Sequence, residues 1–227
     1  MSLQIILGSS SKARREILTE MGYDFTVMTA DIDEKDVRKE KPEELVMALA
    51  EAKADGIISR IQTTDFSEKN VEPALLITAD TAEAIISRLQ SAENEEKDAE
   101  PTLLITADQV VVYEGIIREK PSSKEEARQF IKGYSGGHAA TVGSVLVTNL
   151  KTGTRKGGWD RVEIYFREIP DEVIENLIEE GIVLYVAGAL IIEHPLIFPF
   201  VESVVGTTDS VMGLPKALTE KLIQEVL

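Results

Sequence analysis

The sequence contains no cysteine, which excludes disulfide bonds, thiol catalysis and cysteine-based metal sites. It also lacks any apolar run near the roughly 18 residues that a membrane-spanning helix needs. The first residues do not have the layout of a signal peptide, because their apolar stretch is short and the basic residues follow it. We therefore expect a cytoplasmic protein that does not interact with membranes.

Basic residues are scarce: 24 Lys and Arg face 40 Asp and Glu, which gives a net charge of −16. Nucleic-acid binders neutralise phosphates with basic patches, so this balance argues against a nucleic-acid partner. It still allows a small phosphorylated substrate, because a few cations gathered in a cleft suffice. The hydrophobic share of 43% and the charged share of 28% are ordinary for a globular protein.

Several familiar catalytic motifs are missing as well. The chain has no Walker A loop, no GxGxxG, no HExxH and no GxSxG. Of the two histidines, His138 lies in a predicted turn, and His194 precedes Pro195 without a partner at metal-ligand spacing. The sequence therefore gives no motif support for a P-loop or Rossmann nucleotide site, a zinc protease or a serine hydrolase.

Strands and helices alternate along the chain, which predicts the α/β class. A Gly-Ser turn follows the first strand, Glu114-Gly115 makes a hairpin, and Ser123 with Glu126 forms a capping box. The predicted strands are 3–7, 103–113, 139–148 and 162–166, and the predicted helices are 11–21, 42–62, 123–133, 170–180 and 215–226.

A tandem duplication interrupts this pattern. Residues 54–81 match residues 82–109 without a gap, with 16 of 28 positions identical. Two copies of a helix–loop–strand unit are too few for a solenoid, so we expect an extra piece on the edge of the domain. The duplication also means that one site residue exists in two versions, Asp80 and Asp108.

The first candidate site is the segment from Gly8 to Arg15, which follows a strand and opens a helix. Main-chain N–H groups at a helix N-terminus, hydroxyls and cations together form an anion site. Lys12, Arg14 and Arg15 lie in the first turn, where the helix dipole disfavours each cation by roughly 0.3–1 kcal/mol. A bound phosphate would remove that conflict, whereas the alternative is a serine cap with exposed arginines.

The second candidate is Asp108, inside an apolar run that predicts a strand buried on both faces. An unpaired charge there is expensive, so such a carboxylate meets a cation, a metal or a catalytic task. A structural salt bridge is the alternative. Asp80 has the same upstream sequence, but the residues after it favour a helix, and we therefore prefer Asp108.

Three further features are weak when taken alone. Lys120 follows the hairpin beside Pro121, and Lys53 lies on the apolar-rich helix; each is more often simply exposed. The acidic cluster Asp31, Asp33 and Glu34 offers oxygen ligands suited to Mg²⁺, although a solvated loop is the more frequent explanation.

In order and spacing these pieces resemble the Maf family of house-cleaning nucleotide pyrophosphatases, known from septum formation. Residues 5–18 resemble the family's opening strand, S-x-S-P-x-R loop and helix, and the match runs from residue 3 to the C-terminus. The other matching segments are the acidic stretch 31–34, the helix lysine in 50–54, the catalytic aspartate in 106–109, the Lys-Pro pair 120–121, the Ser-Gly turn 135–136 and the signature 210–215.

The sequence departs from the family pattern at three places. Lys12 and Ala13 replace the usual Pro and a bulky or basic residue, and Glu119 stands where Gly precedes the family's Lys. Residues 185–190 replace a D-K-A-G-x-Y segment and lose its charged pair. These differences bear on the substrate more than on the reaction.

Within the family, members that prefer dTTP and UTP carry Thr after the catalytic Asp and Gln in a later segment. Gln109 and Glu193 instead resemble the 7-methyl-GTP pyrophosphatases, whereas Ala13 fits neither group. Asp80-Thr81 in the other copy resembles the dTTP type. The alternatives are thus a dTTP/UTP pyrophosphatase that uses Asp80, or an inactive nucleotide-binding regulator.

The resemblance implies one α/β domain over residues 1–227, with two lobes around an elongated mixed sheet and a nucleotide cleft. It implies hydrolysis of a nucleoside triphosphate to monophosphate and pyrophosphate with Mg²⁺, or Mn²⁺, and it implies a homodimer. Asp108 would act on the water, and Asp33, Glu34 and Asp108 would hold the metal. Gln109, Glu193 and Ala13 would meet the base. The triphosphate would lie against Ser9, Ser11, Arg14, Lys53 and Lys120.

Overall fold

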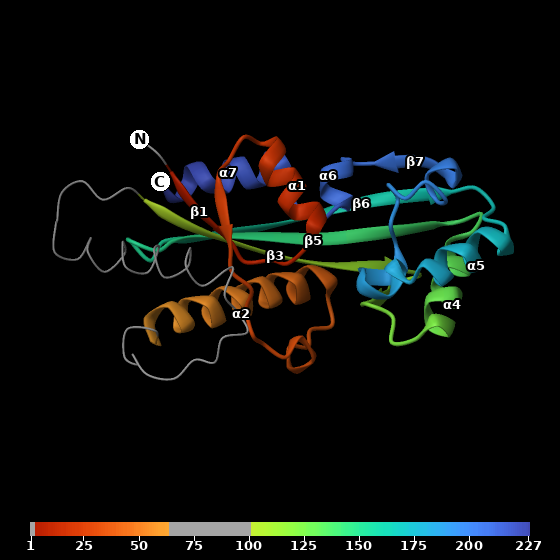
Figure 1. The fold of residues 1–227 in the computed structure, drawn as a ribbon, viewed down its shortest axis with the longest axis horizontal. Helices are drawn as coiled ribbons and strands as arrows, with labels where there is room; N and C mark the ends of the chain where they lie inside the picture. The colour runs from red at the N-terminus through yellow and green to blue at the C-terminus, as the bar shows by residue number, and fades with distance from the viewer. Residues whose placement is uncertain (1–2, 64–100) are drawn as a thin grey trace.

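The computed structural model describes residues 3–63 and 101–227, and its centre is one mixed β-sheet (Figure 1). Within these residues the sheet has seven strands in the order β2-β1-β3-β5-β6-β7, with β4 also paired to β3. β1 runs parallel to β2 and β3, and the other pairs are antiparallel. The strands are β1 (Gln4–Leu7), β2 (Phe25–Val27), β3 (Thr102–Tyr113), β4 (Ile116–Arg118), β5 (His138–Asn149), β6 (Arg155–Phe166) and β7 (Val201–Val205).

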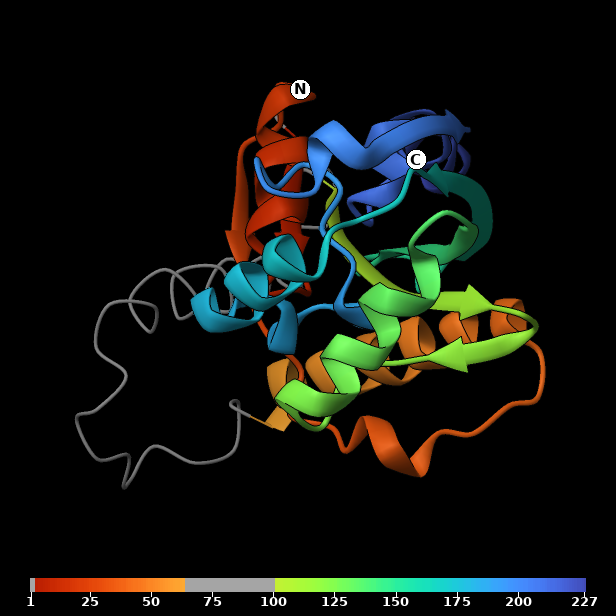
Figure 2. The same cartoon turned by 90° about the vertical axis from the view of Figure 1, so that its right-hand side faces the viewer.

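Helices cover both faces of this sheet. In Figure 1, α2 lies along one face, and α1 and α7 lie along the other; Figure 2 views the molecule from the end at which α4 and α5 pack. The helices are α1 (Lys12–Glu20), α2 (Pro42–Thr63), α4 (Lys124–Tyr134), α5 (Asp171–Glu180), α6 (Thr208–Val211) and α7 (Lys216–Val226). Short 3-10 turns are η1 (Glu34–Asp36), η3 (Ile182–Tyr185), η4 (Ala187–Ala189) and η5 (Phe198–Phe200).

Strand β3 contributes side chains to both faces of the sheet, because successive side chains of a strand point to opposite sides. Ile105 and Ala107 join the apolar cluster under α1 and α7, whereas Leu104 packs with Ile57 of α2. Ile57 is fully buried, and the burial of such a side chain stabilises the fold by about 1.5–3 kcal/mol. A third cluster fills the end between the sheet, α4 and α5. The two faces of one strand thus place neighbouring side chains in different environments.

The predicted α/β class is confirmed, and so are the long strand β3, the hairpin at Glu114-Gly115 and the five predicted helices. The capping box is half formed: Ser123 Oγ accepts from the Glu126 amide at 3.1 Å, but the Glu126 carboxylate accepts from Ser122 instead. The prediction for β6 was too short, because this strand begins at Arg155 rather than at Val162. β2 and β7 were not predicted at all.

Most of the duplicated segment lies outside the described residues. Residues 54–63 of the first copy end α2, and residues 101–109 of the second copy lead into and form part of β3. Asp80 and Thr81 lie outside the described residues, so the choice between the two copies stays a prediction. In the described part of the chain, no helix combines the length and the apolar character that crossing a membrane requires.

Candidate active site

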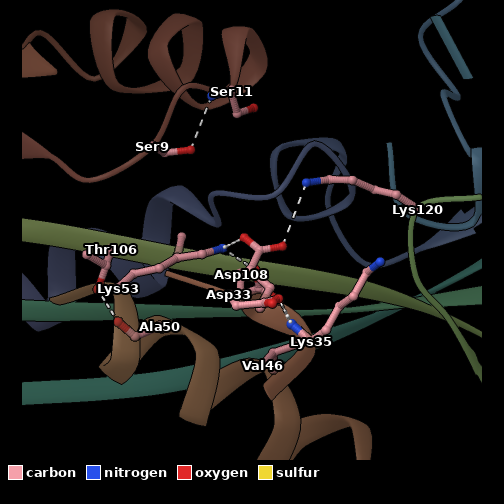
Figure 3. Close-up of polar contacts among 12 residues, drawn as sticks. Ser9, Ser11, Asp33, Lys35, Val46, Ala50, Lys53, Thr106, Asp108 and Lys120 are labelled. Carbon is pink, nitrogen blue, oxygen red and sulfur yellow. Dashed lines mark hydrogen bonds and ion pairs between the residues drawn. The ribbon is translucent and has the colours of Figure 1, made fainter. Parts of the chain in front are cut away.

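The site begins where strand β3 loses its neighbour. β1 ends at Leu7 opposite Ile105, and β4 begins to pair only at Val111 opposite Arg118. Between these points, the described residues supply no strand against this edge of β3. The loop that follows β1 borders the gap at one end, and Lys120, two residues after β4, borders it at the other (Figure 3). In open α/β sheets, ligands bind in the crevice beyond the carboxyl ends of strands, and the loop after Leu7 leaves such an end.

Gly8 brings the first loop close to β3. Its amide donates to the Ile105 carbonyl at 2.7 Å. A Cβ atom at this position would lie 2.6 Å from Thr106 Cγ2 and 2.8 Å from Ile57 Cδ1, so any residue larger than glycine forces its neighbours to shift. The sequence pattern predicted a turn here but gave no sign of this close contact.

Two serines order the start of α1. Ser9 Oγ accepts from the Ser11 amide at 3.2 Å, and Ser11 Oγ caps the helix by accepting from the Arg14 amide at 3.3 Å. Ser9 is buried, whereas Ser11 is partly exposed. The predicted cap is confirmed, and the hydroxyls and amides gather at one helix N-terminus, where an anion is favoured.

Arg14 turns inward and joins three segments. Its Nε donates to the Gly213 carbonyl at 2.9 Å, and its Nη1 donates to the Ala107 carbonyl at 3.0 Å and to Ser9 Oγ at 3.2 Å. Burial lowers the pKa of Arg14, and the nearby charges of Asp108 and Glu34 offset this only in part. Arginine has five N–H groups, so the donors of Nη2 remain for a ligand as far as the described residues go.

Asp108 lies on the face of β3 that α2 covers, and it pairs with Lys53. The Lys53 ammonium is 2.5 Å from Asp108 Oδ1 and 2.9 Å from Glu34 Oε1. Asp108 is buried, with 8% of its surface exposed, and the Lys53 side chain is 13% exposed. Lys120 continues this series of ion pairs at 3.8 Å from Glu34 Oε2. We call these four residues, Asp108, Lys53, Glu34 and Lys120, the ion-pair chain.

Hydrogen bonds from the sheet to α2 fix the position of Lys53. Thr106 Oγ1 donates to the Ala50 carbonyl at 2.8 Å (Figure 3). Ser144 Oγ donates to the Val46 carbonyl at 2.7 Å. Both acceptors lie in the turns of α2 that precede Lys53. Thr106 is two residues before Asp108 on β3, and Ser144 of β5 pairs directly with Asp108. Side chains alternate along a strand, so both hydroxyls lie on the same face of the sheet as Asp108. The helix is therefore held in register with the carboxylate that its lysine meets.

The charge of Glu34 is favoured although the residue is half-buried. Burial raises the pKa of this carboxyl, but the hydrogen bond and charge of Lys53, with the charges of Lys120 and Arg14, outweigh it and lower the pKa. Glu34 and Asp108 are therefore two carboxylates that converge on a single cation. Oxygen donors of this kind also suit a divalent ion that phosphate oxygens share.

Gln109 faces the other side of the sheet from Asp108. Its Nε2 donates to the Val211 carbonyl at 2.6 Å. The segment 210–215 is held in addition by Ser210 Oγ, which donates to Asp160 at 2.6 Å, and by the bond between Arg14 and Gly213. Asp160 and Gly213 were not among the predicted site residues; the Gly in the C-terminal signature was the only available signal. Gln109 thus borders the site through its contact with the C-terminal loop.

Three other predicted residues lie apart from the ion-pair chain. Asp33 is exposed and caps η1 by accepting from the Lys35 amide at 2.9 Å. Glu193 is exposed in the turn between η4 and η5, and Ala13 lies partly exposed in the first turn of α1. Across residues 3–63 and 101–227, no three His, Cys, Asp or Glu side chains are grouped closely enough to hold a metal by themselves.

Comparisons with known proteins agree with this arrangement. The model of the family described as Maf-like protein matches residues 4–226. A 7-methyl-GTP pyrophosphatase of Dictyostelium discoideum is 34% identical over 225 residues, which cover 99% of this chain and 98% of that protein. A dTTP/UTP pyrophosphatase of Alkaliphilus metalliredigens is 29% identical over 212 residues, covering 93% and 90%. A 7-methyl-GTP pyrophosphatase of Idiomarina loihiensis is 28% identical over 179 residues, covering 79% and 72%. With its site geometry and a family match over nearly its whole length, the chain belongs to the Maf-like protein family.

Proposed function

We propose that this chain is a nucleoside triphosphate pyrophosphatase that releases pyrophosphate and a nucleoside monophosphate, with a 7-methyl-GTP-like nucleotide as the favoured substrate. The observation that carries the proposal is the buried carboxylate of Asp108 at the open edge of β3, paired to Lys53 at 2.5 Å. The names of the relatives support the same reaction, because each is a pyrophosphatase of a nucleoside triphosphate.

Asp108 is the residue that acts on water in this proposal. Lys53 binds its Oδ1, so Oδ2 is the oxygen that accepts a proton from the attacking water. The water oxygen forms a bond to the α-phosphorus, and the bond from phosphorus to the α,β-bridging oxygen breaks. Pyrophosphate leaves with that oxygen. The second hydrogen of the water stays on the new monophosphate until solvent exchanges it.

The triphosphate lies between the two ends of the gap. Ser9, Ser11 and the free donors of Arg14 bind it at the helix N-terminus, and Lys53 and Lys120 neutralise the charge that develops on the leaving pyrophosphate. Because Lys53 holds two carboxylates in the free protein, an incoming phosphate competes with them for its ammonium group.

Asp108 and Glu34 are the residues suited to hold a divalent cation, Mg²⁺ or Mn²⁺, together with phosphate oxygens. Both offer carboxylate oxygens to one point, now filled by the Lys53 ammonium. Asp33 lies next to Glu34 and supports the acidic character of this loop. When bound, the cation supplies charge neutralisation and polarises the phosphoryl oxygens.

We assign recognition of the base to Gln109 and Glu193. The small side chain of Ala13, in the first turn of α1, leaves space for the base beside the loop after β1. The Val211 contact fixes the Gln109 amide so that its Oε1 is the end left to accept from a base. Glu193 is exposed and offers a carboxylate that accepts from guanine N1–H and the 2-amino group. A dTTP/UTP preference is the second candidate, because relatives with that name match nearly the whole chain.

The test is pyrophosphate release from a panel of nucleoside triphosphates, including 7-methyl-GTP, dTTP and UTP, with and without Mg²⁺. We expect metal-dependent release that is fastest with 7-methyl-GTP. Fastest release from dTTP or UTP would support the second candidate. A folded protein that gains thermal stability with nucleotide but releases no pyrophosphate would overturn the enzyme and favour a nucleotide-binding regulator.

A further inference from the structure

Lys120 has little of its own to hold it in place. Its side chain is 60% exposed, and its one ion pair among the described residues, to Glu34, spans 3.8 Å. An exposed pair at that distance is too weak to fix a long side chain. The position of Lys120 therefore depends on the main chain that leads into it, which is Arg118 and Glu119.

Both of those residues are anchored at the α4 end of the molecule. The guanidinium carbon of Arg118 lies 4.1 Å from the ring centre of Tyr113, 4.6 Å from that of Phe130 and 5.0 Å from that of Tyr134. Its Nη1 also donates to the Phe130 carbonyl at 3.0 Å. Cation–π contacts on three rings hold a guanidinium more firmly than one contact does.

Gly188 supplies the second anchor, directly before Lys120. Its amide donates to the Glu119 carbonyl at 2.8 Å, and its own carbonyl accepts from the Tyr134 hydroxyl at 2.8 Å. Gly188 thus connects α4 to the chain just before Lys120. Tyr134 is 1% exposed, and burial raises its pKa to about 12, so the hydroxyl keeps its proton near neutral pH.

The backbone at this point is held in an uncommon conformation. Gly188 has φ of 60°, and a Cβ atom there would lie 2.5 Å from Val111 Cβ and 2.8 Å from the Tyr134 hydroxyl. Ala189 follows with φ of 54°, a region that non-glycine residues rarely occupy. Such conformations persist only where the surroundings hold them, and they gather at ligand clamps.

We propose that Tyr134 and Arg118, acting through Gly188 and Glu119, are positioning residues for Lys120 in the pyrophosphatase reaction. We call Arg118, Glu119, Tyr134 and Gly188 the Gly188 clamp. It sets where the Lys120 ammonium stands relative to Glu34 and the phosphates. This inference rests on the proposed function, since it gives the clamp its task in that reaction.

The test is a double-mutant cycle between Tyr134→Phe and Lys120→Ala, read as kcat/KM for pyrophosphate release. Tyr134→Phe removes only the hydroxyl, which donates to Gly188 and also lies beside the Arg118 guanidinium. We expect kcat/KM to fall about threefold to tenfold, the usual range for one hydrogen bond. In the Lys120→Ala background the same change should cost less than about twofold, because the residue that it positions is gone.

Two controls separate positioning from general stability. Tyr113→Phe removes a hydroxyl from another ring that contacts Arg118, but it leaves the Tyr134–Gly188 hydrogen bond. It should leave kcat/KM within about twofold of the wild type. Arg118→Lys, which keeps a cation over the rings, should retain more activity than Arg118→Met. Melting temperatures of all variants show whether each protein is folded.

Equal losses from Tyr134→Phe in both backgrounds, or no loss in either, would overturn the clamp while leaving the enzyme intact. Wild-type protein that releases no pyrophosphate would overturn the proposed function instead. In that case the same double-mutant cycle is measured by nucleotide binding: for each variant, the quantity compared is the rise in melting temperature caused by a GTP analogue with an α,β-methylene bridge. Coupling between Tyr134 and Lys120 in that readout supports the clamp, and additive or absent effects overturn it.

Discussion

The ammonium of Lys53 lies 2.5 Å from the Asp108 carboxylate at the one stretch of β3 that no described strand covers on that side. A buried carboxylate needs a cation, and α2 supplies it from a position that the hydroxyls of Thr106 and Ser144 fix. The same cation also meets Glu34. The ion-pair chain is therefore both a structural solution to buried charge and the centre of the proposed chemistry.

Asp108→Asn separates these two roles. The amide keeps the shape of the side chain but is a far weaker base, so we expect kcat for pyrophosphate release to fall by about 10²–10⁴. Asp171→Asn is the matched control, because the Asp171 side chain is exposed on α5 and pairs with Lys132 rather than Lys53. Full turnover in folded Asp108→Asn protein would contradict the assignment of the base.

Lys53→Met should lower both stability and activity. It leaves the buried Asp108 carboxylate without its cation, and the loss of one partner of a buried ion pair costs about 3 kcal/mol of unfolding free energy. The double variant Asp108→Asn/Lys53→Met removes both charges and should recover most of that stability without any activity. Chemical denaturation measures the effect; equal stability of the single and double variants would show that the pair is not coupled.

We expect Glu34 to contribute to the loss of folding stability at low pH. The net effect of its surroundings lowers its pKa, so the folded state binds this proton less readily than the unfolded state. Its contribution to stability is present above the unfolded pKa, about 4.3, and is lost as the pH falls through the lower folded value. Glu34→Gln should therefore flatten the decline in urea midpoint below about pH 4.3. An unchanged decline would contradict the lowered pKa.

Gly8→Ala tests the close contact between the first loop and β3. The added methyl would stand 2.6 Å from Thr106 Cγ2, so either the loop or β3 must move, at a cost of roughly 1–3 kcal/mol. Since Ser9 follows directly, we also expect a higher KM for triphosphates. Gly137→Ala is the control, because the nearest atom to its Cβ lies at 3.6 Å. Equal thermal stability of the two variants would refute the steric argument.

Local signals predicted much of this molecule. A Gly-Ser turn, a serine cap and alternating apolar runs are encoded within a few residues of one another, and α1, α2 and β3 accordingly form within a residue or two of the predicted bounds. β6 was underestimated because Gly157-Gly158 and the exposed residues before Val162 break the apolar alternation. β7 was missed because it is short and Glu202 and Ser203 interrupt its valines, so the apolar residues do not alternate.

The site was harder to predict because its contacts join distant parts of the chain. Arg14 bonds to carbonyls that lie 199 and 93 positions away, and no local pattern specifies a main-chain acceptor. The predicted residues were types that could serve a phosphate, but their pairing came from the topology of the sheet. Alternation along β3 did carry one further signal, that Asp108 and Gln109 face opposite sides.

Gln109→Thr should change substrate preference and stability together. The shorter side chain cannot reach the Val211 carbonyl that Gln109 now binds at 2.6 Å, which leaves a buried acceptor unpaired at a cost of about 1 kcal/mol. It also removes the Oε1 that we assign to the base, so the preference for 7-methyl-GTP over UTP should fall by roughly tenfold.

Glu193→Gln provides the comparison, because Glu193 is exposed and its change should shift preference without lowering the melting temperature. The measurement is the ratio of kcat/KM for the two nucleotides, with melting temperatures beside it. If Gln109→Thr raised KM equally for both nucleotides, the ratio would stay constant. Gln109 would then act only by holding the loop that carries Gly213, whose carbonyl binds Arg14, and base selection would lie with Glu193 alone.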